Sequence, residues 1–283
     1  MKKWLYKKIV EIIHYKRHLF PCQPIRGYIE RFMVYLKRND IEIKQVGIQI
    51  AKGCNYSCSF CAQKDEPKIY EFMDGSLFDR IISELRAMDF HGILCPYLDG
   101  ESMLHPNYVN MVIHAAKQLP KAEIQISTNG SLMTIKDYCL LLEQPNVVIW
   151  LDTHGHKDVI EKVKSWPAHK RAFIDEKKEP DGLMNWAGSL PTDFKLPLKQ
   201  GCQRANTSLS ITFDGKVRSC GLDTKNKQVV GDLKENTIVE IWYNEKWTKL
   251  RWLLRNNDRS WLACAKCDES GLYPCADTRY IKD

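Results

Sequence analysis

The sequence predicts an α/β fold in which a parallel sheet or partial barrel is followed by a smaller hairpin-and-helix unit. Short apolar runs alternate with amphipathic helical segments over residues 46–200, which is the order of right-handed βαβ units. Polar motifs follow the apolar runs, where the carboxyl ends of parallel strands hold ligands. After residue 200 the pattern changes to an alternating strand, a turn and a return strand.

The elements follow from the hydrophobic periodicity in chain order. We predict strands over residues 46–51, 92–98, 122–127, 147–151 and 171–174. We predict helices that begin at an N-cap Ser76, at Pro106, at an N-cap Thr134 and at His156. In the second unit, the strand 208–213 and the turn at Asp214-Gly215 predict a β-hairpin, since glycine adopts positive φ readily.

Length and composition limit the class of protein. The chain has 283 residues, long enough for a substantial core, and no apolar stretch of the length that spans a bilayer. It begins with a charged segment rather than a signal peptide. Eleven cysteines in such a chain indicate reduced, metal-binding thiols. We therefore expect a cytoplasmic protein.

The net charge of +7 is concentrated in residues 1–45, the first of three predicted domains. Apolar and basic residues recur there at helical spacing. Such a basic extension suits a membrane surface, an acidic peptide or a phosphate-bearing substrate, or it packs on the main domain with its lysines in solvent. The rest of the chain is nearly neutral, which argues against a nucleic-acid partner.

Three cysteines follow the first predicted strand: Cys54, Cys58 and Cys61. Three thiolates hold three corners of an iron–sulfur cube and leave one iron open to a ligand that is not protein. A tetrahedral zinc site would need another cysteine or histidine pair nearby, and the nearest downstream candidates are His91 and Cys95. The triplet therefore indicates an iron–sulfur cluster.

With Phe60 before its last cysteine, the triplet resembles the hallmark of the radical S-adenosylmethionine (radical SAM) enzymes. The resemblance implies a partial (β/α)6 TIM-like barrel over residues 46–200 and a 4Fe-4S cluster whose open iron binds S-adenosylmethionine. A flavodoxin- or ferredoxin-type donor would supply one electron. Cleavage of S-adenosylmethionine would then give a 5′-deoxyadenosyl radical that abstracts hydrogen from a substrate.

Further motifs resemble the parts of that family that hold S-adenosylmethionine. Asp99-Gly100-Glu101 is similar to its Gly-Gly-Glu loop, with Asp99 in place of the first glycine, and a carboxylate suits the methionyl ammonium. Ser127, Asn129 and Asp152 follow later strands. The resemblance implies cofactor contacts from these side chains: Phe60, Gly100, Glu101, Ser127, Asn129 and Asp152.

Two further residues are candidates for catalysis. His154 lies at a predicted strand end, where it would serve as a base. Cys95 lies within a predicted strand and would donate a hydrogen atom to a substrate radical, as in epimerases, if it points into the barrel. Both residues have plainer alternatives, a solvated histidine and a packed thiol. Cys139, on an apolar helix face, is expected to be buried.

Residues 201–283 form the third predicted domain. Cys202 and Cys220 flank the hairpin, and Cys264 and Cys267 form a CxxC pair. This spacing resembles the twitch or SPASM domain of radical SAM enzymes and implies an auxiliary 4Fe-4S cluster, with Cys275 as a spare or substitute ligand. A structural zinc site remains the alternative.

The predicted activity is oxidation of a peptide or sugar-like substrate. Length and cysteine spacing most resemble the type that dehydrogenates 2-deoxy-scyllo-inosamine. The alternatives are a radical epimerase, a thioether-forming peptide maturase, a radical enzyme acting on RNA, and a non-catalytic zinc or iron–sulfur protein that binds nucleic acid.

Overall fold

The computed structural model describes residues 42–179, 184–269 and 271. Its main element is an eight-stranded sheet in the order β10-β9-β8-β1-β4-β5-β6-β7. The strands that follow one another as βα units are β1 (Gln45–Ile48), β4 (Ile93–Cys95), β5 (Glu123–Thr128), β6 (Val147–Asp152) and β7 (Ala172–Asp175). They run parallel to one another, as the alternation of strand and helix patterns predicts.

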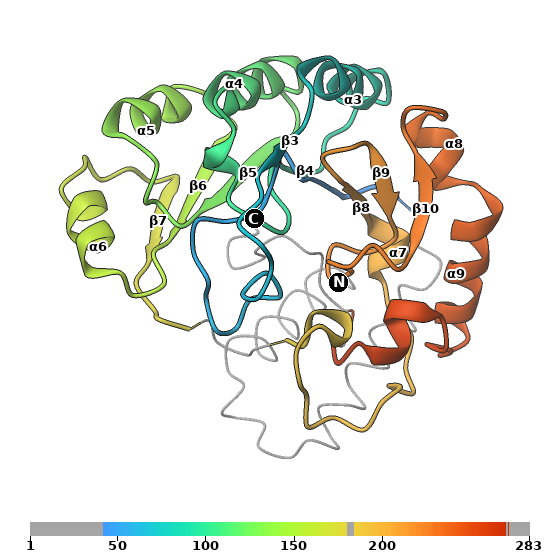
Figure 1. Ribbon diagram of the computed structural model, residues 1–283. Coiled ribbons are helices and arrows are strands. Elements are labelled where there is room, and N and C mark those ends of the chain that lie inside the picture. The colour runs from blue at the N-terminus through green and yellow to red at the C-terminus, as the bar shows by residue number, and fades with distance from the viewer. Residues whose placement is uncertain (1–41, 180–183, 270, 272–283) are drawn as a thin grey trace, which may run out of the picture.

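The helices lie on the convex side of the curved sheet (Figure 1). Those of the βα units are α3 (Gly75–Ala87), α4 (Tyr108–Gln118), α5 (Ile135–Leu142) and α6 (Lys157–Lys164). Those after the hairpin are α8 (Ile238–Trp242) and α9 (Glu245–Arg255), and the short α7 (Arg204–Thr207) precedes the hairpin. The sheet and its helices form the partial TIM-like barrel that the sequence predicts.

Helix starts follow the predicted chemistry with two corrections. Thr134 and Asp137 form a complete capping box at the start of α5, as predicted. The N-cap of α3 is Asp74 rather than Ser76, because the Asp74 carboxylate accepts the Ser76 amide at 2.8 Å. The next helix begins two residues after Pro106, at Tyr108.

The expectation that Cys139 is buried is wrong. Helix α5 packs Tyr138, Leu141 and Leu142 against the core, and Cys139 is exposed. One residue along a helix turns the side chain by about 100°, so position 139 faces away from the neighbours of Tyr138.

The predicted hairpin is present, and it joins the barrel sheet. Strand β8 (Ser208–Ile211) pairs in parallel with β1, and β9 (Lys216–Arg218) and β10 (Val229–Asp232) continue the sheet in antiparallel order. Gly215 takes φ +90° in the turn between β8 and β9. The hairpin thus occupies the sheet position next to β1. The domain limits at residues 45/46 and 200/201 stay predictions.

The two faces of the sheet differ in chemistry. Alternate strand residues such as Val46, Leu94, Ile126 and Ile149 belong to the apolar core under the helices. The intervening positions face the concave side and are mostly polar. They include Gln45, Gln49, Cys95, Gln125, Ser127, Asp152, Ser208, Ser210 and Arg218. The concave side also carries the loop between β2 (Ala51–Lys52) and β3 (Glu71–Phe72), shown in blue in Figure 1.

Some predictions cannot be compared with this architecture. The basic extension falls almost wholly on residues 1–41, and Cys275 lies beyond residue 271, so both are outside the described residues. Among the described residues, no helix has the length and apolar character needed to cross a bilayer.

The tight entry into β4 gives a test of the fold. A Cβ at Gly92 would lie 2.3 Å from the carbonyl oxygen of Lys44, which accepts the amide of Ile93. We expect Gly92→Ala to lower the free energy of unfolding by about 1–3 kcal/mol, because the strand must shift to relieve the overlap. Anaerobic thermal melts should then show a drop of several degrees in Tm.

Gly75→Ala is the matched control. No atom of the described residues lies within 4 Å of a Cβ at this first residue of α3, so the Tm of the variant should stay within about 2 °C of wild type. Equal losses in the two variants would contradict the packing described for Gly92.

Candidate active site

The cysteine loop (residues 53–70) carries Cys54, Cys58 and Cys61 on the concave side of the sheet. Backbone amides point at two of the sulfurs. The Tyr56 amide donates to Cys54 Sγ at 3.3 Å, and the Gln63 amide donates to Cys61 Sγ at 3.4 Å. Such N–H donors stabilise cluster thiolates, so this loop has the donor pattern of an iron–sulfur ligand set.

Burial outweighs the one neighbouring lysine charge that favours ionisation of the thiols in this loop. Burial, followed by the neighbouring Cys61 and Cys54 thiols, raises the pKa of Cys58 to about 11. Burial also raises the pKa of Cys54 and of Cys61. Lys68 opposes these shifts and donates to the carbonyl of Cys54 at 2.9 Å. Three thiolates are stable here when iron supplies the missing positive charge, which fits a cluster.

Gly100 places the loop after β4 directly against the cysteine loop. It has φ +122°, and a Cβ there would lie 2.6 Å from the carbonyl oxygen of Gly53. That same oxygen accepts the Glu101 amide at 2.9 Å. Close backbone approach therefore requires glycine at position 100 and joins the predicted S-adenosylmethionine loop to the residue before Cys54.

The Glu101 carboxylate is bound by its own chain. It is 3% exposed and accepts the Met103 amide at 2.9 Å, the Thr128 hydroxyl at 2.8 Å and the Asn129 amide at 2.8 Å. Burial raises the pKa of Glu101, and these three donors act in the opposite direction. The carboxylate thus has a fixed orientation at the end of β5, with its remaining acceptor capacity free for a ligand.

The other predicted cofactor residues gather at neighbouring strand ends. The Ser127 hydroxyl donates to Asp152 at 2.6 Å, which connects β5 to β6. The side-chain amide of Asn129 donates to Oδ1 of Asn55 at 2.9 Å, and Asn55 lies between Cys54 and Cys58. These contacts bring the predicted residues of β5 and β6 to the edge of the cysteine loop.

His154 lies beside the aromatic ring of the motif. Its ring and that of Phe60 have centroids 5.2 Å apart in an edge-to-face arrangement, and its backbone takes φ +50°. Burial, followed by the nearby charge of His156, lowers the pKa of His154. At neutral pH the imidazole is therefore uncharged and able to accept a proton.

Cys95 lies deeper in the sheet, four residues before Asp99. It is 1% exposed, and its sulfur accepts the side-chain amide of Gln45 at 3.3 Å. Because Gln45 is on the polar, concave face, the thiol of Cys95 also faces the barrel interior.

The four C-terminal cysteines surround one cavity, the auxiliary cavity, which is lined by Cys202, Cys220, Cys264 and Cys267. Burial and neighbouring thiols raise the pKa of Cys264 to about 12, and burial raises that of Cys267 to about 11. Arg204 and Arg259 line the same cavity and oppose the negative charge of thiolates. Within the described part of the chain, no three Cys, His, Asp or Glu side chains are placed to hold a single metal ion.

Small and polar groups fit closely around these sulfurs. A Cβ at Gly271 would lie 2.3 Å from Cys202 Sγ. The side chain of Gln228 donates to Cys264 Sγ at 3.5 Å and accepts the Cys264 amide at 3.1 Å. The donor set of four thiols, cationic neighbours and an amide donor suits an iron–sulfur cluster.

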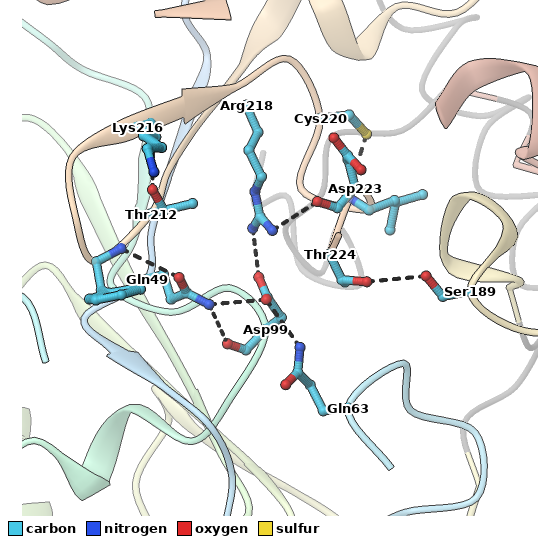
Figure 2. Close-up of polar contacts among 12 residues, drawn as sticks. Gln49, Gln63, Asp99, Ser189, Thr212, Lys216, Arg218, Cys220, Asp223 and Thr224 are labelled. Atoms are coloured by element: carbon cyan, nitrogen blue, oxygen red, sulfur yellow. Dashed lines mark hydrogen bonds and ion pairs between the residues drawn. The ribbon is translucent and has the colours of Figure 1, made fainter. Parts of the chain in front are cut away.

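Two groups of residues between these sites carried no functional prediction from the sequence. Trp186 donates to the Phe60 carbonyl at 3.0 Å and packs on the small apolar cluster that includes Cys220 and Cys267. The second group is the buried pair of Asp99 and Arg218, 2.6 Å apart (Figure 2). The sequence shows the Asn185-Trp186-Ala187-Gly188 segment and the replacement of a motif glycine by Asp99. It does not show that Trp186 contacts Phe60 or that Asp99 pairs with Arg218.

Comparisons with known proteins agree with this geometry. The radical SAM superfamily model matches residues 48–172, and the iron–sulfur cluster-binding SPASM domain matches residues 202–268. The S-adenosyl-L-methionine-dependent 2-deoxy-scyllo-inosamine dehydrogenase of Niallia circulans is 25% identical over 222 residues, covering 76% of this chain and 88% of its own.

Solved structures show the same fold. The crystal structure of BtrN in complex with AdoMet and 2-DOIA has a TM-score of 0.71 at 24% identity, and the match covers 81% of this chain and 94% of BtrN. SuiB of Streptococcus suis bound to S-adenosylmethionine has a TM-score of 0.51 at 13% identity, covering 87% of this chain and 78% of SuiB.

These matches confirm the predicted family and remove the alternative of a non-catalytic protein that binds nucleic acid. They also decide between iron and zinc at the C-terminal site. The chain belongs to the radical SAM superfamily: it is an oxidoreductase-type enzyme that uses a 4Fe-4S cluster with S-adenosylmethionine and carries a SPASM-type domain for an auxiliary iron–sulfur cluster.

Proposed function

We propose that this enzyme dehydrogenates a hydroxyl-bearing carbon of a small sugar-like substrate. The observation that carries the proposal is the polar concave face of the sheet. Branched apolar side chains fill the interior of a closed TIM barrel, whereas the polar residues Gln49, Ser127 and Asp152 occupy interior positions at or just after the carboxyl ends of strands here. A polyhydroxylated ligand matches such a surface better than an apolar one does.

Unused hydrogen-bonding groups support the same substrate class. Gln45 Oε1, Gln125 Oε1 and Ser208 Oγ are buried and have no hydrogen-bond partner among the described residues. A buried polar atom without a partner costs about 1–3 kcal/mol, which hydroxyl or amino groups of a ligand would offset. The similarity to the 2-deoxy-scyllo-inosamine dehydrogenase, whose name specifies an aminocyclitol, supports this choice over a peptide.

We assign the ligand sets as the sequence predicts them. Cys54, Cys58 and Cys61 would hold the first cluster, and the cysteines that line the auxiliary cavity would hold the second: Cys202, Cys220, Cys264 and Cys267. When bound, the first cluster supplies the electron that splits S-adenosylmethionine into methionine and a 5′-deoxyadenosyl radical, and the auxiliary cluster takes up the electron that dehydrogenation leaves. A flavodoxin- or ferredoxin-type protein is the proposed electron donor.

Side chains at the strand ends would orient the cofactor. Glu101 offers a fixed carboxylate to the methionyl ammonium, and Gly100 allows the backbone to approach closely. Ser127 and Asn129 offer polar groups to the carboxylate or ribose, Asp152 would lie near the adenosyl group or the substrate, and Phe60 precedes the last cysteine of the triplet.

His154 is the proposed base. Oxidation of an alcohol to a ketone removes one hydrogen atom from carbon, one proton from oxygen and one electron. Bound S-adenosylmethionine would supply the group that takes the hydrogen atom, and the neutral imidazole of His154 would accept the hydroxyl proton.

A radical epimerase is the second candidate, because the Cys95 thiol faces the barrel interior beside Gln45. There the thiol would return a hydrogen atom to the substrate radical. The two reactions differ in their products and in their need for Cys95.

Isotope transfer tests the proposed reaction. We expect an aminocyclitol or sugar deuterated at the oxidised carbon to deliver one deuterium to 5′-deoxyadenosine and to yield the ketone, as followed by mass spectrometry. Cys95→Ala should retain this activity, because dehydrogenation returns no hydrogen to the substrate. An inverted alcohol that incorporates solvent hydrogen in wild type and disappears in Cys95→Ala would instead establish epimerisation.

Metal analysis tests the ligand assignment. Protein reconstituted without oxygen should hold about eight irons per chain, as two 4Fe-4S clusters require. The triple Cys54/Cys58/Cys61→Ala variant should retain about four and lose reductive cleavage of S-adenosylmethionine. Cys139→Ala is the control, since Cys139 is an exposed thiol on α5, and it should keep the wild-type iron content. A single zinc retained by the triple variant would contradict the auxiliary cluster.

The pH dependence tests His154. A base must be neutral, and the pKa of His154 is lowered from its usual value of about 6.5. We therefore expect kcat to decline as the pH is lowered and the imidazole becomes protonated, with the midpoint of this acid limb below pH 6.5. His154→Gln should lower kcat by about 10²–10⁴-fold and abolish this acid limb, while substrate-free cleavage of S-adenosylmethionine persists. An acid limb that is unchanged in the variant would exclude His154 as the base.

A further inference from the structure

A buried ion pair connects the barrel to the hairpin of the SPASM-type domain. Arg218 Nη2 on β9 lies 2.6 Å from Asp99 Oδ1, just after β4, and the two side chains are 1% and 5% exposed (Figure 2). The other terminal nitrogen of Arg218 donates to the Asp223 carbonyl at 3.0 Å. The pair is therefore shielded from solvent and from ions, so salt screens it little.

Asp99 also receives donors from two other segments. The side-chain amide of Gln49, just after β1, donates to Asp99 Oδ2 and to the Asp99 carbonyl, both at 3.0 Å. The side-chain amide of Gln63, in the cysteine loop, donates to Oδ2 at 3.2 Å. Both carboxylate oxygens are thus used, and the loop after β4, the cysteine loop and the hairpin meet at one side chain.

Each end of this network adjoins a proposed ligand or cofactor residue. Gln63 is two residues after Cys61, and Asp99 directly precedes Gly100. Arg218 is two residues before Cys220. Asp99 is thus bonded directly to the S-adenosylmethionine loop, and one residue separates Arg218 from Cys220.

The network continues into the auxiliary cavity. The Asp223 carboxylate accepts a hydrogen bond from the backbone amide of Gln228 at 2.6 Å. The Gln228 side chain donates in turn to Ser219 Oγ at 2.8 Å and to Cys264 Sγ at 3.5 Å. A continuous set of hydrogen bonds thus runs from the cysteine loop to a sulfur of the auxiliary site.

We propose that Asp99 and Arg218 are a positioning pair that couples S-adenosylmethionine binding to the state of the auxiliary iron site. The proposal rests on the ligand sets assigned above. Both Asp99 oxygens are occupied by donors of the chain itself, so the pair acts through Gly100–Glu101 on one side and through Cys220 on the other. A glycine at position 99, as in the Gly-Gly-Glu motif that this loop resembles, would leave Arg218 without its carboxylate.

Two other contacts join the same parts of the molecule and serve as comparisons. Lys225 forms an ion pair with Glu66, but the side chains are 44% and 41% exposed, and exposed pairs contribute little. Trp186 donates to the Phe60 carbonyl and packs beside Cys220 and Cys267. Only the Asp99–Arg218 contact of these three is both buried and charged.

A double-mutant cycle on S-adenosylmethionine affinity tests the proposal without any substrate. Affinity is measured on reduced, reconstituted enzyme from the change that S-adenosylmethionine causes in the electron paramagnetic resonance signal of the first cluster. We expect C220A to weaken binding at least about fivefold in the wild-type background and less than about twofold in D99N. K225Q, which breaks the exposed pair, should leave the full effect of C220A.

Iron content tests the ligand role of Cys220 separately from the coupling through Asp99 and Arg218. C220A should lower iron from about eight to about four per chain. If iron stays at about eight, the assignment of Cys220 is wrong and the proposal fails with it. If iron falls but the effects of C220A and D99N on affinity multiply independently, the ligand set stands and the coupling is overturned. If the effect of C220A on affinity survives D99N but disappears in W186F, Trp186 carries the coupling, and the proposal is overturned.

Two variants of Arg218 test the proposal in case D99N does not fold. R218K keeps the buried positive charge and should preserve most of the C220A effect, whereas R218Q should abolish it. Equal behaviour of R218K and R218Q would overturn the role of the ion pair.

Discussion

The parallel pairing of β8 with β1 is the constraint on which the rest of this molecule depends. It aligns Gln45 with Ser208 and Ile48 with Ile211, and so continues the barrel sheet into the hairpin. Because the cysteine loop follows β1 and Cys220 follows β9, this pairing brings the two cysteine sets to the concave side of one sheet. The distance between the first cluster and the auxiliary site is thereby set by strand geometry rather than by a flexible linker.

The sheet separates stability from chemistry by its two faces. Alternating side chains pack under α3, α4, α5 and α6, where burial of apolar area stabilises the fold. The other face holds amides, hydroxyls, a thiol and an arginine. Polar groups on that face cost free energy in the folded chain, so their retention makes sense for a surface that binds a polar ligand.

The two proposed iron sites share an electrostatic requirement. Burial raises the pKa of thiols at both sites, so the thiolate form depends on bound iron for its counter-charge. Loop geometry at the first site comes from Gly53 and Gly100, and at the auxiliary site from Gly271 beside Cys202. Glu101 and Asp99, adjacent to Gly100, are both held by donors of the chain itself, so a cofactor bound as proposed would meet preorganised groups.

The sequence by itself determined the features that depend on local pattern. Hydrophobic periodicity predicted the strands and helices of the βα units, the capping box at Thr134 and the turn at Gly215, because each is a property of a few consecutive residues. The spacing of Cys54, Cys58 and Cys61 predicted the family for the same reason. The Ser76 N-cap and the burial of Cys139 were wrong, because a neighbouring aspartate and the packed side of α5 decided them.

Tertiary structure decided what depends on residues far apart in the chain. One of the two partners of β1 is a strand more than a hundred and fifty residues later, and no periodicity specifies which edge a hairpin joins. The Asp99–Arg218 pair spans 119 residues, so neither residue alone indicates a buried charge. The three donors to Glu101 come from residues on both sides of α4. Long-range contacts of this kind are set by the packing of the whole sheet, which local sequence preferences do not encode.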